Sequence, residues 1–304
     1  MKQTSNNKAT SQPLTSQLQE NCKVVTRQFQ GTCLESTSKG DTVVSPSDFQ
    51  SVNDLSHSHT AQNNKNSSCT PTHAHTHTLN VLIACEESQA ECIAFRQLGH
   101  NAYSCDLQPC RPNGHPEWHI QADVAPLLRG VTQFTTQDGT KHTLSHWHLI
   151  IAHPPCTYLC KVSSVQMWKD GQLNEDRLRQ MIYARDFFML CLNANAAHVA
   201  VENPLPMKRA CLPQPDCFIQ PSWFGVKYTK KTLYWLKNLP PIMPEIEYPN
   251  PHSFVMASRG KYRSRTFPQV AQALATQWSQ YILQQLDDNS MIQSTKTAKP
   301  NHNT

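Results

Sequence analysis

A cysteine and a glutamate, each close to proline, are the side chains of this sequence best suited to chemistry. Cys156 comes directly after Pro154 and Pro155, and consecutive prolines hold a turn rigid. We therefore expect the Cys156 thiol to face a cleft instead of packing in the core. Glu202 precedes an Asn-Pro pair further along the chain. Because a nucleophilic thiol needs a nearby acid or base to manage the protons of its partner, Glu202 is the candidate for that task.

Two aspartates form a second candidate group. Asp106 and Asp123 each follow a short apolar run that predicts a strand. A carboxylate after a second strand can bind the hydroxyls of a ribose, although a single aspartate there is more often a turn or cap residue. Asp123 is suited to accept a hydrogen bond from an exocyclic amine. Together, the two carboxylates favour an adenosine-type ligand.

The turn after the first predicted strand narrows the choice of ligand. It contains Cys85 and Glu86, followed by a second glutamate, where dinucleotide-binding proteins carry glycines. Carboxylates at this position repel a pyrophosphate, which counts against NAD, FAD and ATP. A ligand with a cationic or amino-acid end suits the turn better.

Alternating strands and helices must position these residues. We expect Ser88 and Glu91 to form a capping box that begins a helix ending at Gly99. Apolar runs and helical spacing predict the other elements: strands at 79–84, 102–105, 119–122, 148–152, 198–201, 218–219 and 232–236, and helices at 175–192 and 268–283. This order predicts an α/β fold with an open, mostly parallel sheet and helices on both faces. Ligands bind such sheets outside the carboxyl ends of the strands, where all the candidate residues lie.

The two ends of the chain differ in composition from its middle. The chain has 304 residues and a formal net charge of +5. Ser, Thr, Asn and Gln dominate residues 1–77, so we predict a disordered polar arm there, a single domain over 78–286 and a disordered tail over 287–304. No apolar run approaches the roughly 20 residues of a membrane helix, and the start lacks a secretory signal. We therefore expect a soluble, intracellular protein without a membrane partner, whose 12 cysteines are reduced thiols.

Taken together, these motifs resemble a known family, the DNA cytosine C5-methyltransferases. More narrowly, they resemble the compact cytosine methyltransferase-like proteins of phage and prophage genomes. The resemblance spans about residues 79–284 and rests on six segments: Val81–Gln89, Tyr103–Asp106, Gly114–Ile120, Pro154–Leu159, Val201–Pro204 and Tyr228–Thr232.

The resemblance implies a fold, a cofactor and a role for each motif. The fold would be the single-domain, Rossmann-like sheet of the S-adenosylmethionine-dependent methyltransferases, and the substrate would be DNA. Asp106 would bind the ribose of S-adenosylmethionine and Asp123 the adenine. Cys156 would attack C6 of a flipped cytosine while Glu202 engages N3, because C6 is a poor electrophile without an acid at N3. The cofactor-binding set would also include three residues in the turns after the first and fourth strands: Cys85, Glu86 and Pro154.

Basic residues gather late in the chain and are the candidate DNA contacts. Residues 227–265 carry eight Lys or Arg against two Glu, which suits contacts to phosphate. Within this region we expect four residues to bind substrate: Lys230, Lys231, Arg263 and Arg265.

Other interpretations of the same residues remain open. The chain could be a catalytically silent nucleic-acid-binding protein on the same fold. It could also methylate an amino group of adenine or cytosine, although His153 and Cys156 fit that chemistry poorly. A structural zinc site is a further possibility, because two cysteines and two histidines follow a C-x4-C-x4-H-x3-H spacing: Cys105, Cys110, His115 and His119. No metal is otherwise expected.

Overall fold

A seven-stranded sheet forms the centre of the computed structural model, which describes residues 77–254 and 266–297. The strand order is β10-β12-β9-β6-β1-β2-β3. The strands from β9 to β3 run parallel to one another, whereas β12 is antiparallel to both of its neighbours. The strands of this sheet are β1 (Asn80–Ala84), β2 (Asn101–Asp106), β3 (His119–Gln121), β6 (Leu149–Ala152), β9 (His198–Asn203), β10 (Cys217–Ile219) and β12 (Thr232–Lys237).

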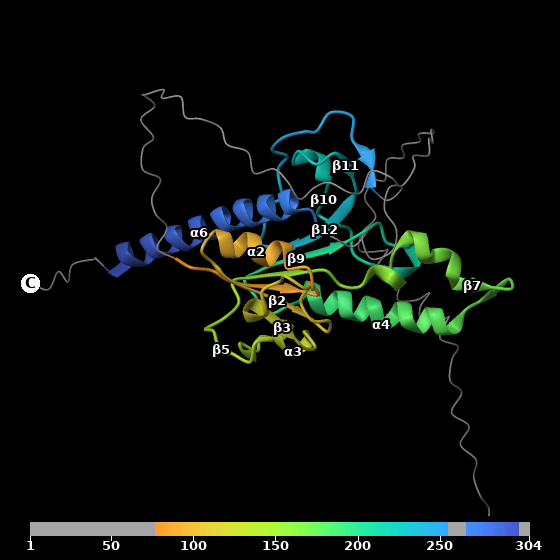
Figure 1. The fold of residues 1–304 in the computed structure, drawn as a ribbon, viewed down its shortest axis with the longest axis horizontal. Helices are drawn as coiled ribbons and strands as arrows, with labels where there is room; N and C mark the ends of the chain where they lie inside the picture. Colours follow the sequence, from red (N-terminus) through yellow and green to blue (C-terminus); the bar gives the residue numbers. More distant parts are fainter. Residues whose placement is uncertain (1–76, 255–265, 298–304) are drawn as a thin grey trace, which may run out of the picture.

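Helices cover both faces of the sheet, as Figure 1 shows. Helices α2 (Ala90–Gln97) and α6 (Pro268–Thr297) lie together on one face and bury the odd-numbered side chains of β1. Helices α3 (Ala125–Leu128) and α4 (Glu175–Leu192) cover the other face and bury its even-numbered side chains. Every residue of β1 and β6 is buried, as expected of parallel strands with helices on both sides.

Short strands and 3-10 turns lie outside the central sheet. Three small sheets consist of β4 (Gln133–Thr135) with β5 (Lys141–Thr143), β7 (Trp168–Lys169) with β8 (Gln172–Leu173), and β11 (Tyr228–Thr229) with β13 (His252–Ser253). The 3-10 turns are η2 (Pro116–Trp118), η3 (Cys156–Tyr158), η4 (Lys161–Met167), η5 (Lys208–Ala210) and η6 (Pro221–Trp223). None of the helices in the described ranges combines the length and apolar composition needed to cross a bilayer.

The predicted fold class is confirmed. The structure is a Rossmann-like α/β domain whose central sheet is mostly parallel and lies between helices. Each of the seven predicted strands is present, and α4 has the predicted bounds. Asn174 caps α4 by accepting a hydrogen bond from the backbone N–H of Arg177.

Two predicted helix boundaries are wrong. The capping box of Ser88 and Glu91 does not form, because Cys85 and Gln89 both adopt left-handed backbone conformations and α2 begins only after Gln89. Helix α6 extends to Thr297, whereas the sequence pattern predicted its end at Leu283. No glycine or proline follows Pro268 in this helix, so nothing in the local sequence stops it.

The connections of the sheet define where a ligand can bind. From β1 the chain continues to β2 and β3 on one side, whereas β6 and β9 lie on the other side. The strand order therefore reverses between β1 and β6. In open α/β sheets the crevice outside the carboxyl ends of two such strands is the usual ligand site. The turns after Ala84 and Ala152 lie at this edge of the sheet.

Candidate active site

The turn that carries Cys156 continues directly from the central strand β6. The backbone N–H of His153 donates to the carbonyl of Ala84, 2.9 Å away, so the β1–β6 ladder extends one residue beyond the strand. The Nδ2 atom of buried Asn203 donates to the carbonyl of Pro154 at 3.3 Å. Strand β9 thus positions the turn before Cys156, and Asn203 of the Glu-Asn-Pro motif makes the contact.

The loops after β6 and β9 are hydrogen-bonded to each other through their backbones. The N–H of Lys161 donates to the carbonyl of Leu205 at 2.8 Å, and the N–H of Met207 donates to that of Leu159 at 2.7 Å. From α4, Arg177 donates to the carbonyl of Thr157 at 2.6 Å and lies 4.3 Å from the centre of the Tyr158 ring. The segment with Cys156 is therefore fixed from two sides.

The Cys156 thiol is half-buried and lies within the field of Glu202. Burial raises the pKa of Cys156 to about 11, and the neighbouring Cys160 thiol and Glu202 carboxylate add to the increase. The thiol is therefore protonated near neutral pH in this state. Loss of the negative charge on Glu202 would lower the pKa of Cys156 and favour the thiolate, which is the nucleophilic form.

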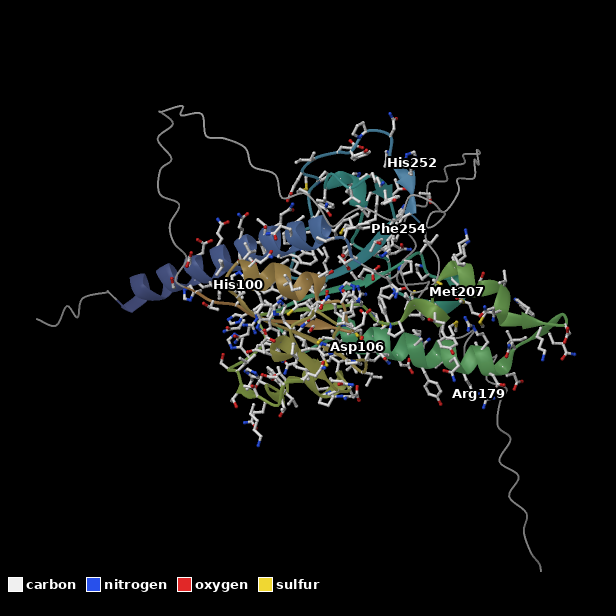
Figure 2. All side chains as sticks on the ribbon, in the orientation of Figure 1. His100, Asp106, Arg179, Met207, His252 and Phe254 are labelled. Carbon is white, nitrogen blue, oxygen red and sulfur yellow. The ribbon has the colours of Figure 1, made fainter. Side chains whose placement is uncertain are left out.

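Strands β1, β2 and β3 bring a second group of candidate residues together. The backbone N–H of Cys85 donates to the carbonyl of Cys105 at 2.7 Å, and that of Ala122 donates to the carbonyl of Asp106 at 3.1 Å, so Cys85, Asp106 and Asp123 lie at the same edge of the sheet. Burial raises the pKa of the Cys85 thiol, and the carboxylates of Asp106 and Asp123 add to the increase. Asp106 marks this edge of the sheet in Figure 2. Cys85 has a φ of 62°, and a left-handed conformation costs roughly 1–2 kcal/mol for a residue other than glycine.

This second group suits an adenosine ligand with a cationic end. Asp106 is partly exposed, and its Oδ1 accepts the N–H of Gln108 at 2.8 Å. Within the described ranges, no hydrogen bond reaches its Oδ2, so this oxygen is available to a ribose hydroxyl. Asp123 is exposed, and its Oδ1 accepts the N–H of Ala125 at 2.9 Å. The carboxylates favour a positive charge nearby and disfavour phosphate, which fits S-adenosylmethionine.

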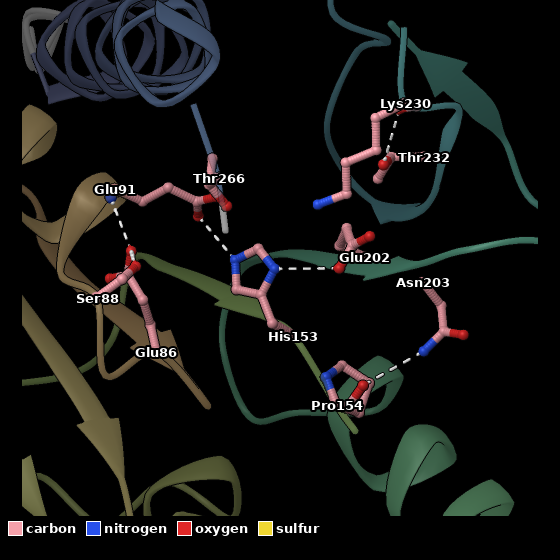
Figure 3. Close-up of polar contacts among 10 residues, drawn as sticks. All are labelled: Glu86, Ser88, Glu91, His153, Pro154, Glu202, Asn203, Lys230, Thr232 and Thr266. Carbon is pink, nitrogen blue, oxygen red and sulfur yellow. Dashed lines mark hydrogen bonds and ion pairs between the residues drawn. The ribbon is translucent and has the colours of Figure 1, made fainter. Parts of the chain in front are cut away.

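The carboxylate of Glu86 is not part of the candidate adenosine site. Its buried carboxylate accepts the backbone N–H of Glu91 at 2.8 Å and that of Cys92 at 3.4 Å, so it caps the start of α2 (Figure 3). Burial raises the pKa of Glu86 to about 7, and the charge of Glu91 adds to the increase. The structure therefore gives Glu86 a role in the fold that the sequence did not indicate.

His153 is the residue of the site that sequence reasoning missed. Its Nε2 atom lies 3.0 Å from Oε2 of Glu91, and its Nδ1 atom lies 3.3 Å from Oε2 of Glu202 (Figure 3). Burial raises the pKa of Glu202, but the hydrogen bond and charge of His153, with the charge of Lys230, bring it below the ordinary value. The only signal in the sequence was the position of His153 at the end of β6.

Of the four residues predicted to bind substrate, the structure describes Lys230 and Lys231. Lys230 lines a narrow pocket with Glu202, and Figure 3 shows its amino group directed toward that carboxylate. Lys231 is exposed, and its Nζ atom lies 4.3 Å from the centre of the Phe218 ring. Arg263 and Arg265 lie outside the described residues. The structure thus places Lys230 beside the candidate acid.

One pocket lies away from these groups. Its volume is about 430 Å³, and Arg96, His100, His115 and Trp118 are among the residues that line it. It contains none of the candidate catalytic or cofactor-binding residues. The pocket beside Glu202 has a volume of about 20 Å³, enough for about one water molecule. A base could enter there only if side chains moved.

The proposed zinc residues do not form a metal site. His119 is bonded through Nδ1 to Ser104 and through Nε2 to the carbonyl of Gln108, while His115 is paired with Glu117. Among residues 77–254 and 266–297, no three His, Cys, Asp or Glu side chains are placed to hold a metal ion.

The fold and site define a Rossmann-like α/β protein with a thiol and a carboxyl group at the carboxyl edge of its sheet. No family model matches the chain, and no curated protein matches it. Among the solved structures, it is similar to a candidate DNA modification methyltransferase encoded within an E. coli prophage, with 14% identity and a TM-score of 0.35. The match covers 57% of this chain and 52% of that protein, so the chain spans about half of its length.

Proposed function

We propose that this protein transfers a methyl group from S-adenosylmethionine to C5 of cytosine in DNA. The observation that carries the proposal is the pairing of Cys156 with Glu202. Cys156 follows β6 and Glu202 lies at the end of the adjacent parallel strand β9. The loops after the two strands are hydrogen-bonded to each other, and Glu202 raises the pKa of the thiol. A thiol and an acid acting together are what attack at C6 of cytosine requires.

The cofactor would lie next to this pair, across the switch point of the sheet. Asp106 would hold the ribose and Asp123 the adenine, with Cys85 beside them. When bound, S-adenosylmethionine supplies the electrophilic methyl group that C5 takes.

The residues of the chain have separate tasks in the reaction. Sγ of Cys156, as a thiolate, forms a bond to C6 while Glu202 donates a proton to N3. The electron pair displaced from the C5–C6 bond makes C5 nucleophilic. After methylation, water takes the proton on C5, the electron pair of that bond re-forms the C5–C6 double bond, and the Sγ–C6 bond breaks with its electrons on sulfur. N3 returns its proton to Glu202, which restores the aromatic ring. The base must leave the helical stack for the thiol to reach it, and Lys230 would contact the extruded nucleotide.

The leading alternative is a silent DNA-binding protein on the same fold. The two proposals differ in their need for Cys156, because binding alone requires no thiol. Methylation of an exocyclic amine would likewise proceed without Cys156.

Trapping with 5-fluorocytosine tests the proposal. After methyl transfer to C5, the mechanism must remove a proton from that carbon, and fluorine cannot leave in this way. Full-length protein incubated with S-adenosylmethionine and DNA containing 5-fluorocytosine should therefore give an adduct that survives a denaturing gel. A randomised duplex serves as substrate, so that every sequence context is sampled.

Matched variants decide which thiol reacts. Cys156→Ser should give no adduct, because a serine hydroxyl is far less ionised than a thiol. Cys160→Ser is the control, since Cys160 lies on the same loop and should leave trapping intact. Methylation of cytosine by Cys156→Ser, or trapping through Cys160, would contradict the mechanism. Salt-dependent DNA binding without trapping or methylation would favour the silent-binder alternative.

A further inference from the structure

His153 is held between two carboxylates that come from different elements. Glu91 on α2 meets its Nε2 atom and Glu202 at the end of β9 meets its Nδ1 atom. The Glu91 side chain is 0% exposed, and those of His153 and Glu202 are 15% and 19% exposed. Because an ionised carboxylate can only accept hydrogen bonds, both contacts are satisfied at once when both ring nitrogens carry protons. The geometry therefore fits an imidazolium ion.

The other charged and titratable groups around His153 determine its charge. Burial disfavours the imidazolium, but the two carboxylates outweigh burial and raise the pKa of His153 well above its ordinary value. Glu86 also faces the cluster from the turn after β1. Thr266 donates to Glu91, Lys230 acts on Glu202, and the Cys156 thiol lies on the far side of Glu202. The Tyr234 hydroxyl on β12 is near both carboxylates and remains protonated.

This arrangement addresses a difficulty in the proposed chemistry. The pKa of Glu202 is lowered in the structure, so Glu202 is ionised near neutral pH and has no proton to give to N3. Its negative charge also raises the pKa of the Cys156 thiol. A proton on Glu202 would remove the first obstacle and lessen the second, because burial still raises the pKa of the thiol. Nδ1 of His153 contacts Glu202 at 3.3 Å and can donate this proton.

We propose that His153 supplies this proton to Glu202, and that Glu91 keeps the ring oriented and charged between turnovers. The inference rests on the proposed function of the site. The Nδ1 proton of His153 moves to the ionised Glu202, which passes it on to N3. The ring becomes neutral and still donates from Nε2 to Glu91. The proton returns along the same route when N3 is deprotonated, so the relay ends each turnover with the protons it began with. His153 is a positioning and relay residue that acts through Glu202.

The charge of the ring can be measured without any enzymatic activity. In full-length protein labelled with ¹⁵N-histidine, the His153 signals are identified by their absence from a His153→Gln variant. Both ring nitrogens should carry protons at pH 8, where an ordinary histidine is neutral. A neutral ring at pH 8 would overturn the inference, whatever the protein does to DNA.

The pH dependence of methyl transfer tests the relay itself. His153→Gln keeps a donor toward one carboxylate but cannot release a proton, so kcat should fall at least tenfold, while KM for DNA and the affinity for S-adenosylmethionine change less than threefold. Glu91→Gln removes the anion that holds the proton on His153. The pH above which kcat declines should therefore move to a lower value. His115→Gln is the control, because His115 is also paired with a glutamate but lies outside the site.

The possible failures can be told apart. If the wild-type protein neither traps 5-fluorocytosine nor methylates DNA, the proposed function and the proton relay are both wrong. If the wild-type protein is active but His153→Gln and Glu91→Gln keep its pH profile, the relay alone is wrong. A fall in activity with an unchanged pH profile would assign His153 a purely structural role and would also overturn the inference.

Discussion

The buried carboxylate of Glu86 should make the stability of this protein depend on pH. Its pKa is raised from the ordinary value of 4.5 to about 7, chiefly by burial and then by the charge of Glu91. A carboxyl group that is more basic in the folded state stabilises the fold only while it is protonated. Its contribution is therefore complete below pH 4.5 and is lost as pH rises through about 7.

The structure sets the size of the effect. A difference of one pKa unit corresponds to about 1.4 kcal/mol, so the change at Glu86 corresponds to about 3 kcal/mol between pH 4.5 and pH 8. For a domain of this size, 1 kcal/mol moves the melting temperature by about 2–4 °C. Glu86→Gln removes the ionisation but keeps an oxygen that can accept the N–H groups of α2. We expect the melting temperature of the wild type to fall relative to that of Glu86→Gln as pH rises. The difference between the two melting temperatures should increase by about 6–12 °C from pH 5 to pH 8.

Scanning calorimetry of both proteins at several pH values measures this difference. The matched control is Glu87→Gln, because Glu87 is the next residue, is partly exposed, and is paired with Arg111 at 2.6 Å. Such a pair near the surface contributes at most about 1 kcal/mol, so its loss should change the melting temperature much less than the effect expected at Glu86. Parallel curves for the wild type and Glu86→Gln would refute the reasoning.

Two further predictions concern the candidate site. S-adenosylmethionine should raise the melting temperature of the protein. Asp106→Ala should abolish this increase, because the substitution removes the proposed ribose contact. Calorimetry that finds no binding at millimolar cofactor would reject this assignment. Alkylation of Cys156 by iodoacetamide should be slow near neutral pH and accelerate toward pH 11, since the thiol must ionise first. Glu202→Gln should speed this alkylation by removing a neighbouring negative charge, as peptide mass spectrometry can measure, and an unchanged rate would contradict the electrostatic coupling.

The strands and the long helix could be predicted because their signals are local. A continuous apolar run such as Leu149–Ala152 predicts a strand buried on both faces, and helical spacing over Glu175–Leu192 predicts α4. The order of the strands could not be predicted in the same way. Strand β12 inserts between β9 and β10, and nothing within its own residues specifies antiparallel neighbours on both sides.

The candidate site was predictable where a residue ends a strand. Cys156, Glu202 and Asp106 all lie at the carboxyl edge, as the sequence indicated. The roles of Glu86, Glu91 and His153 were not predictable, because each depends on a contact that local sequence does not encode. His153 and Glu91 are 62 residues apart, and they meet only because α2 begins after the unexpected left-handed turn at Cys85 and Gln89.

The backbone hydrogen bonds between the loops after β6 and β9 limit how the lengths of these two loops can vary. An insertion between Cys156 and Lys161 would shift the bonds of Leu159 and Lys161 with the loop after β9, unless that loop changed as well. The two segments can therefore gain or lose residues only together. The exposed turn at Asp170 and Gly171, where β7 meets β8, carries no such constraint from this pairing, and its length could change while the distance between thiol and carboxyl stays the same.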